Sequence, residues 1–492
     1  MNRQKALFLI GLLLLPFWAI SQKEKPLRVE IELPRDATDY KTIPVGENGV
    51  IIFYEGQGTH IDSATWVFIQ YDTNLVKQKS HVIKTPANLV YNIATHEGEK
   101  MHLFLLDKFQ KKTTLNSYFL TLNFATGEYN LATIEGFYDE NINFAKKVND
   151  NFFLISYLKR NYDVYHYDAK LNQIHTLKFG KEYIQSIEFC EVDTFMRRIS
   201  WGMVLELSSN NTVMHYIETD YSGSIISKLP FPRYTGYSYM TARMMIIDST
   251  QSLVIGTYID DEDKRKSLLP TGIYTMRMID HTLQDPDFFS DTQIKSNDST
   301  VAKPVKKDQN LQALVGNIKR TNGNYTLVTE IFYPEYEYTS SNYGYDPFYY
   351  GTRSTPTTNF LGYRFLHANI ITFDENGQLI WSQHMPFRNV LTLNLFPRIS
   401  TFQFENNTVI YYIFNATLSY MMVNRHTVIE PVTSKNIILS NSNEAVDYSR
   451  NVQINNWYGN YFLVSGYQNL KGKSRSSKTK RYVFYMNKME YR

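Results

Sequence analysis

The sequence predicts an all-β protein built as a single β-propeller of about eight four-stranded antiparallel blades. Three observations lead to this prediction. Apolar runs recur about every 50 residues, turn signals lie beside these runs, and the composition includes 38 Tyr and 30 Phe among 492 residues. Aromatic residues favour strands, and units of about 50 residues with four short strands are typical of propeller blades. Seven blades with one irregular unit is the alternative count.

The repeat consists of short, nearly continuous apolar runs such as Val50-Ile51-Ile52-Phe53. The first residues of the runs are Val50, Met101, Phe152, Met203, Leu253, Tyr325, Thr408 and Tyr461. Successive first residues lie 51, 51, 51, 50, 72, 83 and 53 positions apart, which indicates a period with two insertions. A strand without polar alternation fits burial on both faces, so each run is expected to be a central strand of its blade.

Turn signals support four strands in each unit. Glu47-Asn48-Gly49 and Asn322-Gly323-Asn324 directly precede apolar runs and suit a tight hairpin. A second strand-turn-strand pattern follows in most units and is clearest at Phe373-Asp374-Glu375-Asn376-Gly377. Each unit therefore resembles an antiparallel meander.

A closed ring requires a partner for the last blade. The final unit ends after a strand expected at Tyr482 to Asn487, where other units turn into a fourth strand. The alternating segment Leu27 to Leu33 has no partner within its own unit. We therefore predict that 27–33 supplies the outer strand of the last blade. A membrane β-barrel is the main structural alternative, although its strands should alternate strictly between polar and apolar residues.

The N-terminus predicts a signal peptide over residues 1–21. Arg3 and Lys5 precede an apolar stretch, and Ala19-Ile20-Ser21 is a small-residue cleavage pattern. No later segment is long and apolar enough to cross a membrane as a helix. We expect an exported protein of the periplasm, outer membrane or cell surface of a Gram-negative bacterium, with residues 22–492 forming one propeller domain.

Two short motifs resemble those of secreted or periplasmic β-propeller proteins of the Bacteroidota. They are the Ser21-Gln22 signal junction and the hairpin from Ile371 to Trp381, which reads ITFDENGQLIW. The resemblance covers only these segments and points to no particular characterised family. It implies an extracytoplasmic propeller.

The insertions are expected to carry recognition, because extra residues in a propeller lie in loops. A polar insertion is predicted at 285–310 and a Tyr-rich loop at 333–363. Prolines at 334, 347 and 356 argue against a strand or helix continuing through the second insertion. Tyr offers a large ring and a hydroxyl for contacts. The candidate binding residues are Tyr336, Tyr338, Tyr343, Tyr345, Phe348, Tyr349 and Tyr350. Alternatively, these rings fold back as a lid that stabilises the blade.

A basic loop from Lys471 to Arg481 occupies the same relative position in the last unit. Its positive charges suit phosphate groups, an acidic glycan or an acidic protein, and the alternative is a solvated hairpin tip. The candidate binding residues here are Lys473, Arg475, Lys478 and Lys480. Loops after the second strand of every blade lie on one face. The two loops above, the charged loop from Asp260 to Lys266 and the segment from Gln57 to Thr65 should therefore share one rim.

The sequence offers no catalytic residues, no cofactor site and no metal ligands. The 11 histidines show no His-Glu-x-x-His spacing, and neither a Gly-x-Ser-x-Gly elbow nor a phosphate-binding glycine loop occurs. The single cysteine, Cys190, lies in a strand-like run and is expected to be a buried apolar residue. A net charge of +3 gives no argument for a nucleic-acid partner.

The leading hypothesis is therefore a non-enzymatic binding or scaffold protein of the cell envelope. It would recognise an envelope protein complex or a surface glycan through rim loops, either as a monomer or as a subunit of a hetero-complex. The alternative is a carbohydrate-active enzyme, a glycosidase or lyase, with carboxylates at the mouth of the propeller channel. Such a pair leaves no local pattern when its members come from different blades.

Overall fold

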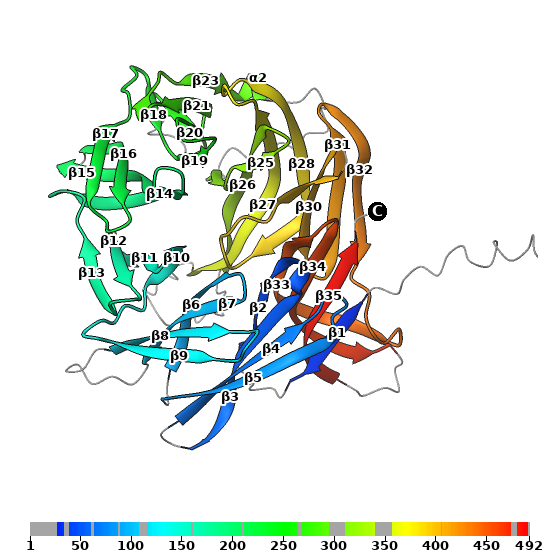
Figure 1. The fold of residues 1–492 in the computed structure, drawn as a ribbon. Coiled ribbons are helices and arrows are strands. Elements are labelled where there is room, and N and C mark those ends of the chain that lie inside the picture. The colour runs from blue at the N-terminus through cyan, green and yellow to red at the C-terminus, as the bar shows by residue number, and fades with distance from the viewer. Residues whose placement is uncertain are drawn as a thin grey trace, which may run out of the picture.

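The computed structural model shows eight antiparallel sheets arranged as the blades of one closed ring (Figure 1). It describes residues 27–33, 39–60, 63–86, 89–107, 116–158, 161–208, 211–263, 268–294, 310–339, 357–404, 406–473 and 480–490. The predicted propeller is confirmed, and the count is eight blades, so the alternative of seven is wrong. The predicted signal peptide lies outside the described residues.

In the first four blades, four strands follow one another both along the chain and across the sheet. Blade 1 is β2 (Lys41–Pro44), β3 (Val50–His60), β4 (Ser63–Tyr71) and β5 (Lys77–Pro86). Blade 2 is β6 (Leu89–Glu97), β7 (Lys100–Asp107), β8 (Asn116–Asn123) and β9 (Tyr129–Glu135). Blade 3 is β10 (Ile142–Val148), β11 (Asn151–Leu158), β12 (Asn161–Asp168) and β13 (Gln173–Leu177). Blade 4 is β14 (Tyr183–Asp193), β15 (Arg198–Ser208), β16 (Asn211–Asp220) and β17 (Ile225–Pro230).

Blades 5 and 6 are divided at their edges, and blade 8 takes its last strand from the N-terminus. Blade 5 is β18 (Tyr237–Tyr239) with β19 (Arg243–Ile246), β20 (Gln251–Asp260), β21 (Gly272–Ile279), and β22 (Thr282–Leu283) with β23 (Asp287–Ser290). Blade 6 is β24 (Gln312–Val315) with β25 (Lys319–Thr321), β26 (Asn324–Thr339), β27 (Thr357–Phe373) and β28 (Leu379–Thr392). Blade 7 is β29 (Ser400–Phe404), β30 (Asn407–Phe414), β31 (Thr417–Asn424) and β32 (Thr427–Asn436). Blade 8 is β33 (Glu444–Tyr458), β34 (Tyr461–Gly472), β35 (Lys480–Glu490) and β1 (Arg28–Glu32).

Helical structure in the described residues is limited to the single turns η2 (Gly46–Asn48) and α2 (Asp291–Ile294). No helix among these residues has the length and apolar character that a membrane span requires. Of the polar insertion predicted at 285–310, the structure describes β23, α2 and residue 310. Residues 295–309 lie outside the described part of the chain.

The eight apolar runs of the sequence lie on the second strands of the eight blades: β3, β7, β11, β15, β20, β26, β30 and β34. Alternate residues on such a strand face opposite neighbours. In β3, Ile51 and Phe53 pack in a core cluster shared with blade 2, whereas Val50 and Ile52 pack in a cluster shared with blade 8. Both faces of the strand are therefore buried, which explains why the run does not alternate between polar and apolar residues.

The N-terminal strand closes the ring as predicted. β1 pairs antiparallel with β35, with Arg28 opposite Asn487 and Glu32 opposite Val483. The next residue, Leu33, is buried in the cluster between blades 8 and 1. One blade is thus made from both ends of the chain, as the blue and red strands side by side in Figure 1 show.

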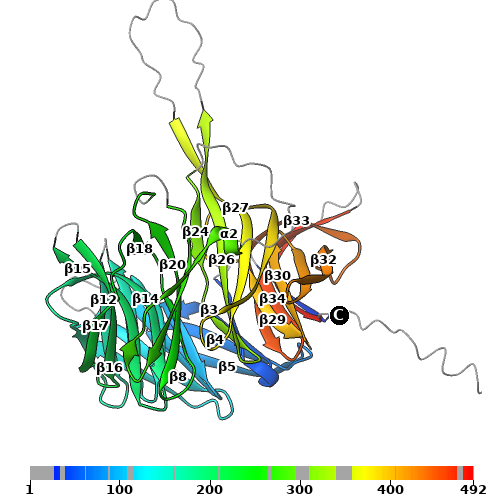
Figure 2. The same cartoon turned by 90° about the horizontal axis from the view of Figure 1, so that it is seen from above.

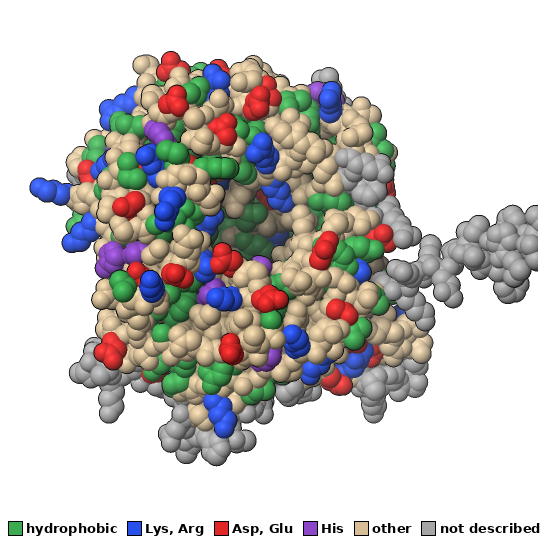
Figure 3. All heavy atoms as spheres, in the orientation of Figure 1, with side chains coloured by type: hydrophobic (Ala, Val, Ile, Leu, Met, Phe, Trp, Pro, Cys, Tyr) green, Lys and Arg blue, Asp and Glu red, His purple; other side chains and the backbone are tan. Residues whose placement is uncertain are grey.

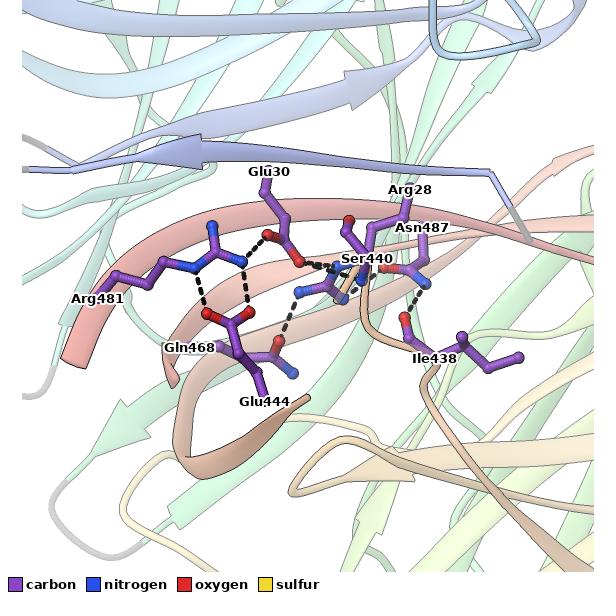
Figure 4. A network of polar contacts seen from close by, with 8 residues as sticks. All are labelled: Arg28, Glu30, Ile438, Ser440, Glu444, Gln468, Arg481 and Asn487. Atoms are coloured by element: carbon purple, nitrogen blue, oxygen red, sulfur yellow. Dashed lines mark hydrogen bonds and ion pairs between the residues drawn. The ribbon is translucent and has the colours of Figure 1, made fainter. Parts of the chain in front are cut away.

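Charged side chains reinforce this closure (Figure 4). Arg28 donates from Nε to Glu30 at 2.5 Å, from Nη1 to Asn487 Oδ1 at 2.8 Å and from Nη2 to Gln468 Oε1 at 2.7 Å. Arg481 of β35 bridges Glu30 and a further carboxylate at the start of β33, that of Glu444. The side chains of Arg28 and Glu30 are only 3% and 7% exposed, so this network lies largely inside the seam.

Candidate binding face

The face that carries the connections between second and third strands is here called the hairpin face. Because successive strands in each blade run antiparallel, β3, β20, β26 and β34 all end on this face. The four unusual loops predicted from the sequence follow these strands, so the described strand ends from which they leave share one side of the ring. Figure 2 shows the end of β26 and the start of β27 projecting beyond that side.

The predicted Tyr-rich loop begins as a two-stranded arm. β26 continues through Pro334, which pairs with Tyr363 of β27, so the expectation that no strand runs on past this proline is wrong. The inner neighbour β24 pairs with β26 only as far as Phe332. Pro334 therefore lies where β26 is an edge strand, and a missing N–H group is tolerated there.

Of the seven aromatic candidates, the structure describes the side chain of Tyr336. This ring is 48% exposed and lies 5.5 Å from the ring of Phe360 on β27. Tyr338 lies in β26 opposite Thr358, and the description covers its backbone only. The remaining candidates lie outside the described residues: Tyr343, Tyr345, Phe348, Tyr349 and Tyr350.

Exposed apolar side chains occur on the arm and on the link that follows β28, and together we call them the blade-6 surface. Its members come from β26, from β27 and from the link that follows β28, and they are 38–70% exposed. They are Tyr336, Phe360, Leu361, Leu393, Leu395 and Phe396. Sequence reasoning missed all of them except Tyr336. The run from Leu391 to Phe396 reads as an ordinary half-buried strand, so no local signal marked it as exposed.

Two contacts fix the base of the arm. Arg364 donates from Nε to Glu335 Oε2 at 2.6 Å, and both side chains are about one quarter exposed, at 22% and 27%. The ring of Phe360 lies edge-on to that of Tyr363 at 5.1 Å. The two strands are thus held together by side chains as well as by their ladder.

The link between blades 6 and 7, residues 393–399, leads from the outer strand β28 to the inner strand β29. Glu330, only 1% exposed, anchors its end by accepting the backbone N–H groups of Arg398 and Ile399 at 2.7 and 2.6 Å. Burial raises the pKa of the Glu330 carboxyl to about 7. Burial also lowers the pKa of the Arg398 guanidinium to about 10.

The ring is hollow at its centre (Figure 3), and the link borders a cavity there of about 550 Å³. We call it the channel-mouth cavity. Its walls come from the inner strands β2, β6 and β33, from the link and from the turn at Ile413–Asn415. The charged side chains that line it are Asp39, Lys41, Arg398 and Arg450.

A second cavity of about 610 Å³ is lined mainly by residues of blades 3 to 6. Its carboxylates have cation partners, since Glu188 lies 3.2 Å from Arg243 and Glu191 lies 3.4 Å from Lys146. Cys190 also lines this cavity, and it is buried as predicted; burial raises the pKa of its thiol.

The predicted enzyme alternative requires two carboxylates facing one substrate. The channel-mouth cavity offers one carboxylate, Asp39, among its described lining residues. The second cavity offers two, and each is ion-paired. In the described part of the chain, no group of three His, Cys, Asp or Glu side chains is placed to hold a metal ion.

The basic candidates are distributed over the base of the β34–β35 hairpin. Lys473 donates from its backbone to Asn443 O at 2.8 Å and from Nζ to Ser442 O at 2.7 Å, so it is tied to the segment before β33. Lys480 is exposed in β35, opposite Lys471. Arg475 and Lys478 lie outside the described residues.

Comparison with known proteins identifies only distant structural similarities. No protein-family model matches this chain, and no curated protein does. Similar solved structures include the β-propeller domain of the Trilobed protease from Pyrococcus furiosus, at 8% identity and a TM-score of 0.36, covering 82% of this chain and 95% of that one. The polysaccharide lyase Uly1 is similar at 10% identity and a TM-score of 0.39, covering 81% and 89% of the two chains. A eukaryotic initiation factor is similar at 10% identity and a TM-score of 0.42, covering 92% and 91%. At this level of similarity we draw no inference about function from any of them.

Proposed function

We propose that this protein is a non-enzymatic binding or scaffold protein of the cell envelope that holds a protein or glycan partner on its hairpin face. The observation that carries the proposal is the blade-6 surface. Exposed apolar side chains that lie against each other, as Tyr336 and Phe360 do, are typical of interaction sites, because leaving them in water is unfavourable. We further propose that the chain is exported and acts as a monomer or as a subunit of a hetero-complex.

The rigidity of the arm supports this role. β26 and β27 are continuous with a blade whose core residues are buried, and the ion pair between Arg364 and Glu335 joins them at the base of the projection. Tyr336 and Phe360 already lie against each other in the unbound chain. A surface ordered before binding loses less conformational entropy when the partner arrives.

The test is quantitative affinity capture of the tagged protein from envelope extract of its source cells. The first variant combines Tyr336→Ser with Phe360→Ser, and a second replaces Tyr343, Tyr345, Tyr349 and Tyr350 with Ala. The control combines Leu171→Ser with Phe195→Ser. Those two side chains are 62% and 69% exposed in turns on the opposite face.

We expect one partner at a fixed ratio to the wild-type chain, lost with the hairpin variants and kept with the control, while thermal melts stay unchanged. Equal recovery with all four chains would contradict the proposed face, and recovery of no stoichiometric partner would contradict the scaffold role. Fractionation of the same tagged chain should place it in the periplasmic or outer-membrane fraction.

A further inference from the structure

The cations that line the channel-mouth cavity form weaker contacts with carboxylates than several cations elsewhere in the ring. Lys41 and Asp39 are 3.9 Å apart, at the limit of an ion pair. Arg398 and Arg450 form no direct ion pair in the described part of the chain, although the buried carboxyl of Glu330 acts on Arg398 and partly offsets the lowering of its pKa by burial. The cavity therefore has three positive side chains and one negative one in its wall.

Other partly buried arginines of the ring show the contrast. Arg28, Arg198, Arg243 and Arg481 each lie within 3.2 Å of a glutamate oxygen. In the second cavity the cation at the wall, Arg243, is neutralised in this way. Arg398 is only partly exposed, and a partly desolvated cation without a direct counter-charge is unfavourable, whereas Arg450 is exposed. With Lys41 and Arg450 in the same wall, the excess of positive charge around Arg398 favours an external anion.

Aromatic rings hold the two arginines in place. The Arg398 guanidinium carbon lies 3.7 Å from the centroid of the Phe396 ring, and Nη2 donates to Asn394 O at 2.9 Å. The guanidinium carbon of Arg450 lies 5.1 Å from the ring of Tyr467 and 5.0 Å from that of Tyr482. Aromatic rings stack on the flat faces of a guanidinium, and this leaves its in-plane N–H groups available to donate to an anion.

Unmatched hydrogen-bonding groups occur in the same wall. Arg398 Nε and Ser449 Oγ are buried and have no hydrogen-bond partner among the described residues. The β33 strand is bulged beside them, because its register with β34 shifts between Arg450 and Gln453, and Asn451 adopts a φ of 50°. Bulges of this kind re-aim side chains and are frequent next to binding sites.

The uncharged lining suits a hydroxylated ring. Aromatic side chains, including Tyr91 and Phe414, alternate with amides such as Asn394 and Gln453 around the cavity. Its volume of about 550 Å³ lies within the range of small-molecule sites. Aromatic faces pack against the C–H faces of a sugar, while amides hydrogen-bond its hydroxyls.

We infer that the channel-mouth cavity is a binding site for an acidic saccharide, a sugar whose carboxylate or sulfate group is held between Arg398 and Arg450. The site shares Leu393 and Phe396 with the blade-6 surface, but Arg398 and Arg450 lie outside that surface. Substitutions of the two arginines therefore test the saccharide site, whereas substitutions of Tyr336 and Phe360 test the proposed scaffold role.

The test is calorimetric titration of the purified protein with tri-galacturonate, with a sulfated galactose trisaccharide and with neutral galactotriose. Arg450→Met and Arg398→Met are the site variants. Lys228→Met is the matched control, because it removes the same charge from β17, where Lys228 pairs with Glu182 at 3.1 Å outside the cavity. Thermal melts show whether each variant is folded, and Arg450, which is the more exposed of the two arginines, provides the test if Arg398→Met does not fold.

We expect at least one acidic probe to bind and the neutral probe not to bind. Each folded site variant should weaken binding by about tenfold or more, the loss typical of one hydrogen-bonded charge pair, and the control should bind like the wild type. The stronger of the two acidic probes identifies the anionic group. Absence of binding by both acidic probes, equal binding of the neutral probe, or equal weakening by Lys228→Met would overturn the inference.

Discussion

Replacing Arg28 with Met should open the ring at its seam. Arg28 has a 3% exposed side chain and joins three groups, on its own strand β1, on β34 and on β35. Met retains most of the aliphatic volume and removes all three hydrogen bonds. The substitution therefore tests the charged contacts without creating a large cavity.

The expected loss follows from what remains in the seam. Removing one partner of a buried ion pair costs about 3–5 kcal/mol when the other charge is left uncompensated. Glu30 keeps a second cation, Arg481, so its charge remains matched. The amides of Gln468 and Asn487, which are 0% and 1% exposed, each lose their contact with the guanidinium. We expect a loss at the lower end of this range, about 3 kcal/mol.

The assay is urea unfolding followed by circular dichroism, together with hydrogen exchange of the β1 and β35 amides. Lys471→Met is the matched control in the same blade, since its pair with Asp447 is 50% and 32% exposed and should contribute at most about 1 kcal/mol. Exchange in β1 and β35 should accelerate in the Arg28 variant before exchange in blades 3 and 4. Equal losses for the two variants, or unchanged protection of β1, would refute the idea that the buried network holds the ring closed.

Two further predictions concern single positions. Glu330 has a pKa raised to about 7 from its usual 4.5, so the folded chain keeps a proton that the unfolded chain releases over this window. The free energy of unfolding should therefore fall by up to about 3 kcal/mol as pH rises from 4.5 to 7, because of this group. Glu330→Gln should remove this contribution to the pH dependence of stability. An identical pH dependence in the variant would contradict the raised pKa of Glu330. Gly49 has a φ of +98°, and a Cβ at this position would lie 1.9 Å from the carbonyl oxygen of Tyr71. Gly46 has a φ of +62°, and no atom lies within 4 Å of a Cβ added there. Gly49→Ala should therefore lower the melting temperature clearly more than Gly46→Ala. Equal shifts in the two melts would show that the contact is relieved by backbone movement.

The blade architecture was predictable because it is encoded locally and repeated. A second strand packed between two neighbouring blades must be apolar on both faces, and this requirement produced the run at Val50 and its seven equivalents. Closure by β1 followed from strand counting, since one unit lacked a fourth strand and one N-terminal strand lacked a partner. The burial of Cys190 followed from its strand-like surroundings.

The arm on blade 6 was only partly predictable. Its position between the second and third strands came from the sequence, as did the exposure of Tyr336. The sequence did not predict that β26 continues through Pro334. A proline ends a strand only where a neighbouring strand on that side would accept a hydrogen bond from the missing N–H group. Whether β24 extends far enough to be such a neighbour is decided by the sheet as a whole.

The sequence by itself determined the repeat and the strand that closes the ring, because both depend on patterns within about 50 residues. It favoured eight units over seven, and the structure decided for eight. Only the tertiary structure decided which side chains meet at the channel mouth. Lys41, Arg398 and Arg450 come from three different parts of the chain, and the link that follows β28 reads like a buried strand although Leu393 is 70% exposed. Ring closure brings these segments to one axis, and no local pattern records a contact between residues that far apart.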